Sequence, residues 1–274
     1  MDDQIVAIFT VTSDFLQAMN HYEHPLCVMS DAEVMTTAIV ATLYFGGNFE
    51  LSRALLKQRQ YMPLMLSRSR FNRRLHRIKR HFLALFALLA EQWKTLNVNS
   101  VYSIDSFPIP ICDNYRIKHS KLYDGEEMYR GFIASKKRYF YGLKVHIMVT
   151  QSGEPVEFFL THGSFADVSA TSLYDYDLPE GSIVYGDRAY NLYYWEDILA
   201  EVGIMLKPIR KKKSKRPHEA WVHHWQHVDR KMVETTASLF ERKLPKHIHA
   251  VTSAGFELKV VLFMLSVSLD RSFR

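Results

Sequence analysis

Apolar residues recur with helical spacing through the N-terminal third of the chain. Residues 30–33 have the form of a capping box, and they predict a helix that runs to about Phe45. A second helix is predicted over about 50–59. Ser67 is suited to cap a third helix, which we expect to run unbroken to about Leu96. The pattern predicts a small helical bundle, and a helix-turn-helix is one arrangement that fits it.

From about Val98 the pattern changes to short runs of β-branched and aromatic residues. Strands are predicted over about 100–104, 139–150, 154–161, 182–185 and 204–209. Helices are predicted over about 193–202, 228–244 and 253–269. Three strands followed by strand, helix, strand and helix describe a mixed sheet with helices on both faces. This order matches a ribonuclease H-like domain, in which the first and fourth strands lie side by side.

The expected fold class is therefore α/β, with two regions. Residues 1–97 form an all-helical, helix-turn-helix-like region. Residues 98–274 form a ribonuclease H-like mixed sheet with flanking helices.

Three carboxylates lie at distinctive places in this pattern. Asp105 and Asp187 each end a predicted strand, and Glu234 lies inside a predicted helix. Adjacent first and fourth strands would bring the two aspartates together, and the helix would lay the glutamate against them. Such a group suits two hard divalent cations and displacement at phosphate. Taken singly, the aspartates could instead only end strands and cap turns.

Composition limits the classes of protein that fit. Apolar residues make up 47% of the 274, which is enough for a sizeable core, and the net charge of +6 favours an anionic partner. The chain has two cysteines, no signal-peptide pattern and no apolar run of about 20 residues. We therefore expect a cytoplasmic protein that does not use a membrane.

Positive charge is concentrated in residues 51–90, which contain ten Lys or Arg and no Asp or Glu. Solvated helix faces normally mix charges of both signs, so we interpret this region as contacting phosphates. Five arginines fall at helical spacing on one side of the predicted long helix: Arg70, Arg73, Arg74, Arg77 and Arg80.

A second basic segment lies between the last predicted strand and the helix that carries Glu234. Seven of its ten residues are basic: Lys207, Arg210, Lys211, Lys212, Lys213, Lys215 and Arg216. A solvated linker is the alternative interpretation, but the position beside the expected site favours contact with a DNA backbone. Residues 136–138 (Lys-Lys-Arg) are a further candidate for such contact.

Other titratable residues are weaker candidates. Five more aspartates compete for a metal-binding role: Asp113, Asp124, Asp167, Asp175 and Asp177. Asp167 has the sequence context of a helix N-cap. Four histidines cluster at 218, 223, 224 and 227, but they lack the spacing and partners of a zinc site, so we expect them to face solvent or DNA.

The motifs taken together resemble a known family. The chain resembles the DDE transposases of bacterial insertion sequences, and the insertion-sequence 982 family in particular. The resembling stretches cover nearly the whole chain in order: 26–41, 67–75, 104–110, 131–146, 181–190, 206–217 and 246–259. The resemblance implies that Asp105, Asp187 and Glu234 are catalytic and hold two Mg²⁺ ions, with Asp105 between them, and that Mn²⁺ would substitute.

The resemblance also implies an activity and its partners. The protein would cleave insertion-sequence ends and join the 3′-hydroxyl to target DNA, acting on double-stranded terminal repeats as a dimer or higher oligomer at a bacterial nucleoid. Related groups place Tyr and Lys where this chain has His227 and Glu241, although Arg230 and Glu234 fit their pattern. Arg230 is therefore a further DNA-binding candidate, and the basic residue that meets DNA near the helix end stays open.

Two other functions fit the same residues. One is a structure-selective nuclease or resolvase on the same fold, and the other is a DNA-binding repressor with a decayed site.

Overall fold

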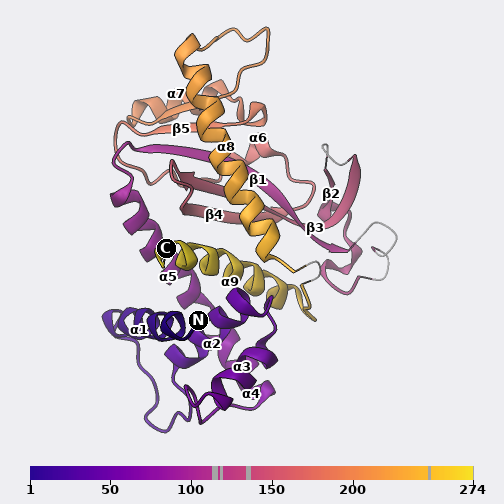
Figure 1. Cartoon of the computed structure of the whole chain (residues 1–274). Coiled ribbons are helices and arrows are strands. Elements are labelled where there is room, and N and C mark those ends of the chain that lie inside the picture. The colour runs from indigo at the N-terminus through magenta and orange to yellow at the C-terminus, as the bar shows by residue number, and fades with distance from the viewer. Residues whose placement is uncertain (113–116, 118–119, 134–136, 246–247, 274) are drawn as a thin grey trace. The chain divides into compact units, whose positions relative to one another are not determined.

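The computed structural model describes residues 1–112, 117, 120–133, 137–245 and 248–273, apart from the side chains of 227, 229, 230 and 241. They form two compact units, shown in Figure 1. Unit 1 comprises Met1–Leu89 and Phe240–Arg274, and unit 2 comprises Ala90–Leu239. The C-terminal segment thus belongs to the unit of the N-terminal helices. The functional division of the chain at residue 97 stays a prediction.

Unit 1 is helical. Its helices are α1 (Asp2–Ala18), α2 (Asp31–Tyr44), α3 (Phe49–Gln58), α4 (Arg68–Arg77), the first part of α5 (Lys79–Leu96) and α9 (Ser253–Ser272). The predicted capping box is confirmed, because the Ser30 side chain accepts from the Glu33 amide and Glu33 accepts from the Ser30 amide. Helices α2 and α9 are buried over most of their length, and Thr42 and Ser266 form a buried hydrogen bond between them.

The single helix expected from Ser67 to Leu96 is wrong, because the chain forms two helices that meet at Ile78. This residue ends α4 with a φ of −93° and a ψ of 11°, and it is 2% exposed. Neither Gly nor Pro marks the break. The buried positions on either side keep the spacing of one helix: Phe71, Leu75, Ile78, Phe82 and Leu85. The apolar pattern alone therefore could not reveal the break.

Unit 2 contains a mixed sheet. Its strands are β1 (Val101–Cys112), β2 (Arg130–Ile133), β3 (Arg138–Thr150), β4 (Pro155–His162), β5 (Ile183–Gly186) and β6 (Met205–Pro208). They are ordered β2-β3-β1-β5-β6, and β4 also pairs with β3. Strand β1 runs antiparallel to β3 and parallel to β5, so the expected pairing of the first and fourth predicted strands is confirmed. This arrangement is consistent with a ribonuclease H-like fold.

Strand β1 is much longer than expected and contains two prolines. Pro108 and Pro110 pair with β3 residues on one side, while the pairing of β1 with β5 ends at Ile104. The described pairing with β5 therefore asks no hydrogen-bond donor of either proline nitrogen, and a proline is tolerated where a strand is not paired on that side. The prolines are therefore compatible with the long strand.

Three helices accompany the sheet: α6 (Asp167–Ala170), α7 (Tyr193–Glu201) and α8 (Ala220–Lys243). Helix α8 crosses in front of the sheet in Figure 1 and starts earlier than the expected residue 228. Two side chains tie it to the sheet. Gln226 donates to the Lys207 carbonyl at 3.0 Å, and Thr236 donates to the Gly153 carbonyl at 3.1 Å. Among the described residues, no helix combines the length and apolar character needed to span a membrane.

Candidate active site

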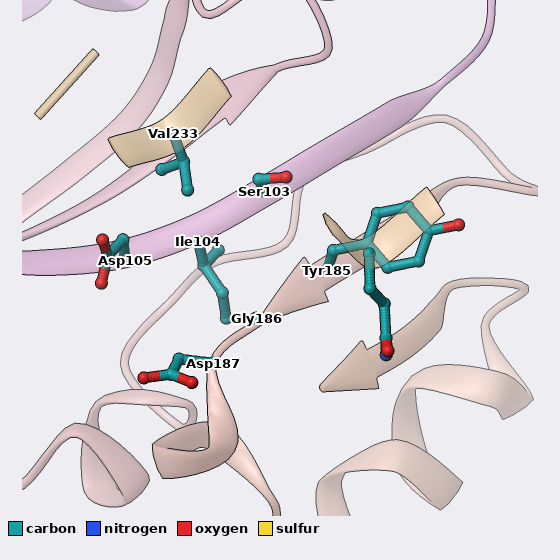
Figure 2. A pocket seen from close by; sticks show the side chains of 8 residues that line it. Ser103, Ile104, Asp105, Tyr185, Gly186, Asp187 and Val233 are labelled. Atoms are coloured by element: carbon teal, nitrogen blue, oxygen red, sulfur yellow. The ribbon is translucent and has the colours of Figure 1, made fainter. Parts of the chain in front are cut away.

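Two aspartates lie next to each other where the pairing of the parallel strands β1 and β5 ends. Asp187 directly follows β5, as predicted, whereas Asp105 lies inside β1 and not at its end. The register of β1 and β5 ends with Ile104 opposite Gly186, and Asp105 and Asp187 are the next residues of the two chains. Neighbouring strands lie about 4.8 Å apart, which sets the separation of the two backbones. Both aspartates line one pocket, and Figure 2 shows both carboxylates at the same end of it. The parallel pairing therefore brings together carboxylates that are far apart in the sequence.

Local hydrogen bonds orient each carboxylate. Asp105 Oδ1 accepts from the backbone amide of Ser106 at 2.8 Å, and Asp187 Oδ1 accepts from that of Arg188 at 2.6 Å. Asp187 thereby caps a short 3-10 helix, Arg188–Tyr190. Both aspartates are half-buried. Asp187 therefore has both roles that the sequence allowed: it caps a turn, and it lines the pocket.

Helix α8 supplies the remaining wall of the pocket. Gln226 and Val233 line it, and Val233 is 2% exposed. Glu234 follows Val233 and is exposed, and it is not among the lining residues. Figure 2 shows Val233 beside the strand that carries Asp105. The structure therefore places the third predicted carboxylate one residue from the pocket wall, and its catalytic role stays a prediction.

The donor set fits hard divalent cations. Among the described residues that line the pocket there is neither His nor Cys, and these residues offer carboxylate, hydroxyl, amide and backbone oxygens. Mg²⁺ and Mn²⁺ prefer oxygen ligands, whereas structural zinc prefers Cys and His. Asp105, Asp187 and the nearby Glu234 could therefore hold such ions.

A different group of metal-ligand types occurs in unit 1. Among the described residues, His21, Glu23 and Asp31 form the group whose ligand atoms all lie within 4.8 Å of one another. Part of its negative charge is already offset, because Arg74 donates to Asp31 and lies 3.7 Å from Glu23. His21 also contacts Asp31, at 2.8 Å, and Arg74 contacts the Cys27 sulfur, at 3.0 Å. We therefore interpret this group as an internal ion network.

The five arginines that were predicted to share one side of a helix differ in exposure. Arg74 forms an ion pair with Asp31, and the two side chains are 13% and 4% exposed. This ion pair is therefore largely buried and connects two segments of unit 1. Hydrogen bonds to Asp31 and Cys27 raise the pKa of Arg74 despite its burial. Four arginines are exposed: Arg70, Arg73 and Arg77 on α4, and Arg80 on α5. These four keep the predicted role in DNA binding, while Arg74 has a partner inside the protein.

The predicted basic loop divides in the same way. Arg210 makes a bidentate salt bridge to Glu196, with both contacts at 2.6 Å and both side chains below 10% exposed. Arg216 pairs with Asp197, and Lys207 lies 4.8 Å from the centre of the Trp221 ring. The exposed members are Lys211, Lys212, Lys213, Lys215 and Arg216, and of these Arg216 has Asp197 as a partner. The predicted contacts of Arg230 and Lys136 lie outside the described residues.

Sequence reasoning missed a polar cluster around Ser106, the residue after Asp105. Asp167 accepts from the Ser106 hydroxyl at 2.8 Å and pairs with Lys144 at 3.1 Å. Its expected N-cap role is wrong, since Ala166 is the N-cap of α6. His146 pairs with Ser106 across the strands and is fully buried. Burial lowers the pKa of His146 to about 4, so it is neutral at pH 7. Only long-range strand pairing assembles this cluster, which is why no local motif predicted it.

Comparison with known families decides which proteins this chain is related to. Residues 95–247, more than half of the chain, match the model of the transposase DDE domain. The chain belongs to this family of DDE transposases. The matched region contains Asp105, Asp187 and Glu234. No curated protein and no solved structure matches the chain. The family match supports a transposase that acts on DNA and belongs to a group of metal-dependent enzymes.

Proposed function

We propose that this DDE transposase, of the insertion-sequence 982 type, cleaves the ends of an insertion sequence and joins the resulting 3′-hydroxyl to target DNA. The observation that carries the proposal is the adjacent position of Asp105 and Asp187 just beyond the last paired residues of β1 and β5, within a chain of the DDE family.

The three carboxylates have a common role in this proposal. Asp105, Asp187 and Glu234 would hold two Mg²⁺ ions, or Mn²⁺ in their place, which supply the positive charge that phosphoryl transfer requires. The Ser106 and Arg188 amides hold one oxygen of each aspartate in place. Because these carboxylates are already oriented, less entropy would be lost when the reacting groups are positioned.

Two basic surfaces would bind the substrate. The exposed arginines of α4 would contact duplex DNA of the terminal repeats, and the four exposed lysines of the loop before α8 would contact DNA near the site. Since two element ends must be processed together, we propose a dimer or higher oligomer as the active form.

The test is a reaction with labelled duplexes that carry the terminal repeats beside the gene, supercoiled target DNA and Mg²⁺. We expect cleaved ends and covalently joined products. A nuclease or resolvase on the same fold would give cleaved products without joined ones. A decayed repressor would bind the duplex and give neither product. Either of these results would contradict the proposed function.

A further inference from the structure

The hairpin of β2 and β3 presents two aromatic side chains to solvent. Phe132 and Tyr139 lie directly opposite each other in the antiparallel register. They are 54% and 47% exposed, and their ring centres are 4.9 Å apart. Figure 1 shows β2 at the opposite side of the sheet from α7. Two large aromatic rings exposed side by side form a specific surface feature, since scattered single side chains are the usual case.

The hairpin is firmly held at its base. A Cβ atom on Gly131 would lie 2.2 Å from the Gly163 carbonyl oxygen and 2.4 Å from the Phe140 ring, so the inner face of β2 packs without space. Next to it, the Tyr129 ring stacks on Tyr123 with centres 3.9 Å apart. The strand that carries Phe132 is therefore tightly packed against its neighbours. Less conformational entropy is lost when a ligand stacks on a rigidly held pair of rings.

The same surface is positively charged. The guanidinium carbon of Arg130 lies 4.6 Å from the centre of the Tyr139 ring, and Lys137 and Arg138 are exposed. Residues 128–153 contain no Asp or Glu. The nearest acidic partner in the contacts of the described residues is Glu127, which lies 3.8 Å from Arg130 and is itself 82% exposed. Self-association through this surface would bring like charges together, whereas a polyanion with flat rings complements it.

We propose that Phe132 and Tyr139 form a stacking platform for unpaired bases of DNA, with Arg130, Lys137 and Arg138 contacting the phosphates. Exposed aromatic rings beside cations are the general means by which proteins bind single strands, because every base has a face that stacks. This inference rests on the proposed function, since it assigns the platform to unpaired DNA at or near an element end.

The platform is separate from the candidate active site. Asp105 pairs with Ile147 of β3, eight residues along the strand from Tyr139. At about 3.3 Å per residue this amounts to about 26 Å along the strand. The platform would therefore hold DNA away from the phosphate that reacts, and its contribution can be measured without any reaction.

The test uses the full chain carrying Asp105→Asn, in EDTA, with fluorescein-labelled oligothymidylate of about 12 nucleotides and a duplex of equal length. Phe132→Leu and Tyr139→Leu should each weaken binding of the single strand by roughly 5- to 150-fold, the equivalent of one lost base stack. Duplex binding should change less than about twofold, since phosphate contacts dominate it. Phe132→Trp should retain single-strand binding, and Tyr194→Leu, an exposed tyrosine on α7, is the matched control.

Circular dichroism melting of every variant tests for unfolding. Equal single-strand affinity of the parent and both leucine variants would overturn the inference. So would an equal loss in Phe132→Trp, or sedimentation showing that the aromatic pair holds two copies together. Because binding is measured without cleavage, a parent protein that fails to join DNA would contradict the proposed function and leave the stacking result to be judged separately.

Discussion

Gly186 lies directly opposite Ile104 in the parallel register of β5 and β1, and the two form the last pair before the aspartates. A Cβ atom on Gly186 would lie 3.1 Å from Ile104 Cγ1 and 3.3 Å from Tyr190 Cβ. The missing side chain lets β5 pack closely on β1 at the point where Asp105 and Asp187 emerge. The spacing of the two carboxylates therefore depends on a glycine that has no chemical role.

Gly186→Ala should lower both stability and DNA cleavage. Overpacking of a filled core costs about 1–3 kcal/mol of unfolding free energy, and the strand that carries Asp187 would shift to relieve it. Urea unfolding and a cleavage assay measure the two effects. In a double-mutant cycle with Ile104→Ala, the two losses of stability should sum to more than the loss in the double variant. Strict additivity would show that the two side chains do not meet.

The arginines of α4 should separate by exposure. Replacing Arg70, Arg73 and Arg77 with Ala should flatten the dependence of log affinity on log salt by about 2–3 units, since each phosphate contact contributes about 0.9. Their exposed positions predict little change in stability. Salt titrations of duplex binding measure the slope.

Arg74→Ala is the matched comparison. Removing it would leave Asp31 buried without its cation, which costs about 3–5 kcal/mol. We expect a large loss of unfolding free energy and no specific change of the salt slope. The reverse result, a stable variant with a flatter slope, would show that Arg74 contacts DNA as the sequence pattern suggested.

His146 should make stability depend on pH. Its pKa of about 4 in the folded state lies below the ordinary value of 6.5, so the unfolded chain binds more protons between these values. Stability is therefore retained above about pH 6.5 and lost as the pH falls toward 4, by about 3 kcal/mol in total. Burial raises the pKa of Glu157 to about 7, which gives the opposite trend, a loss of stability as the pH rises from 4.5 to 7.

The contribution of His146 is isolated by subtraction. The difference in unfolding free energy between the parent and His146→Gln, measured in urea at several pH values, should shrink as the pH falls from 6.5 to 4.5. A difference that stays constant over this range would mean that His146 does not titrate with a lowered pKa.

The sequence supports a large part of this architecture. The runs before Asp105 and Asp187 have the composition of buried strands, and the order of elements places the first and fourth strands together. Ser30 and Glu33 define a helix start because a capping box needs only local atoms. The strand compositions and the helix start depend on residues that are close in the chain, and the pairing of the first and fourth strands was predicted from the order of elements in a known fold.

Features that depend on distant partners could not be predicted. Arg74 shares its helical spacing with exposed arginines, and only its meeting with Asp31, 43 residues away, makes it internal. Arg210 is likewise internal because it meets Glu196 on α7. Of the exposed aromatic pair, Tyr139 lies on a predicted strand, but Phe132 lies on the short strand β2, which the pattern did not predict. A local pattern specifies which residues share a face, but it does not specify what that face meets.

The central claim is that Asp105, Asp187 and Glu234 act together as the metal-binding catalytic group. The most direct measurement compares cleavage and joining by Asp105→Asn, Asp187→Asn and Glu234→Gln with Mg²⁺ and with Mn²⁺. Metal ligation stabilises the transition state by several kcal/mol, so each variant should lose at least about a hundredfold in rate while duplex binding stays intact. The matched controls Asp175→Asn and Glu201→Gln, at exposed positions of unit 2, should retain the parent rate. Activity of any of the three variants within about tenfold of the parent would contradict the claim.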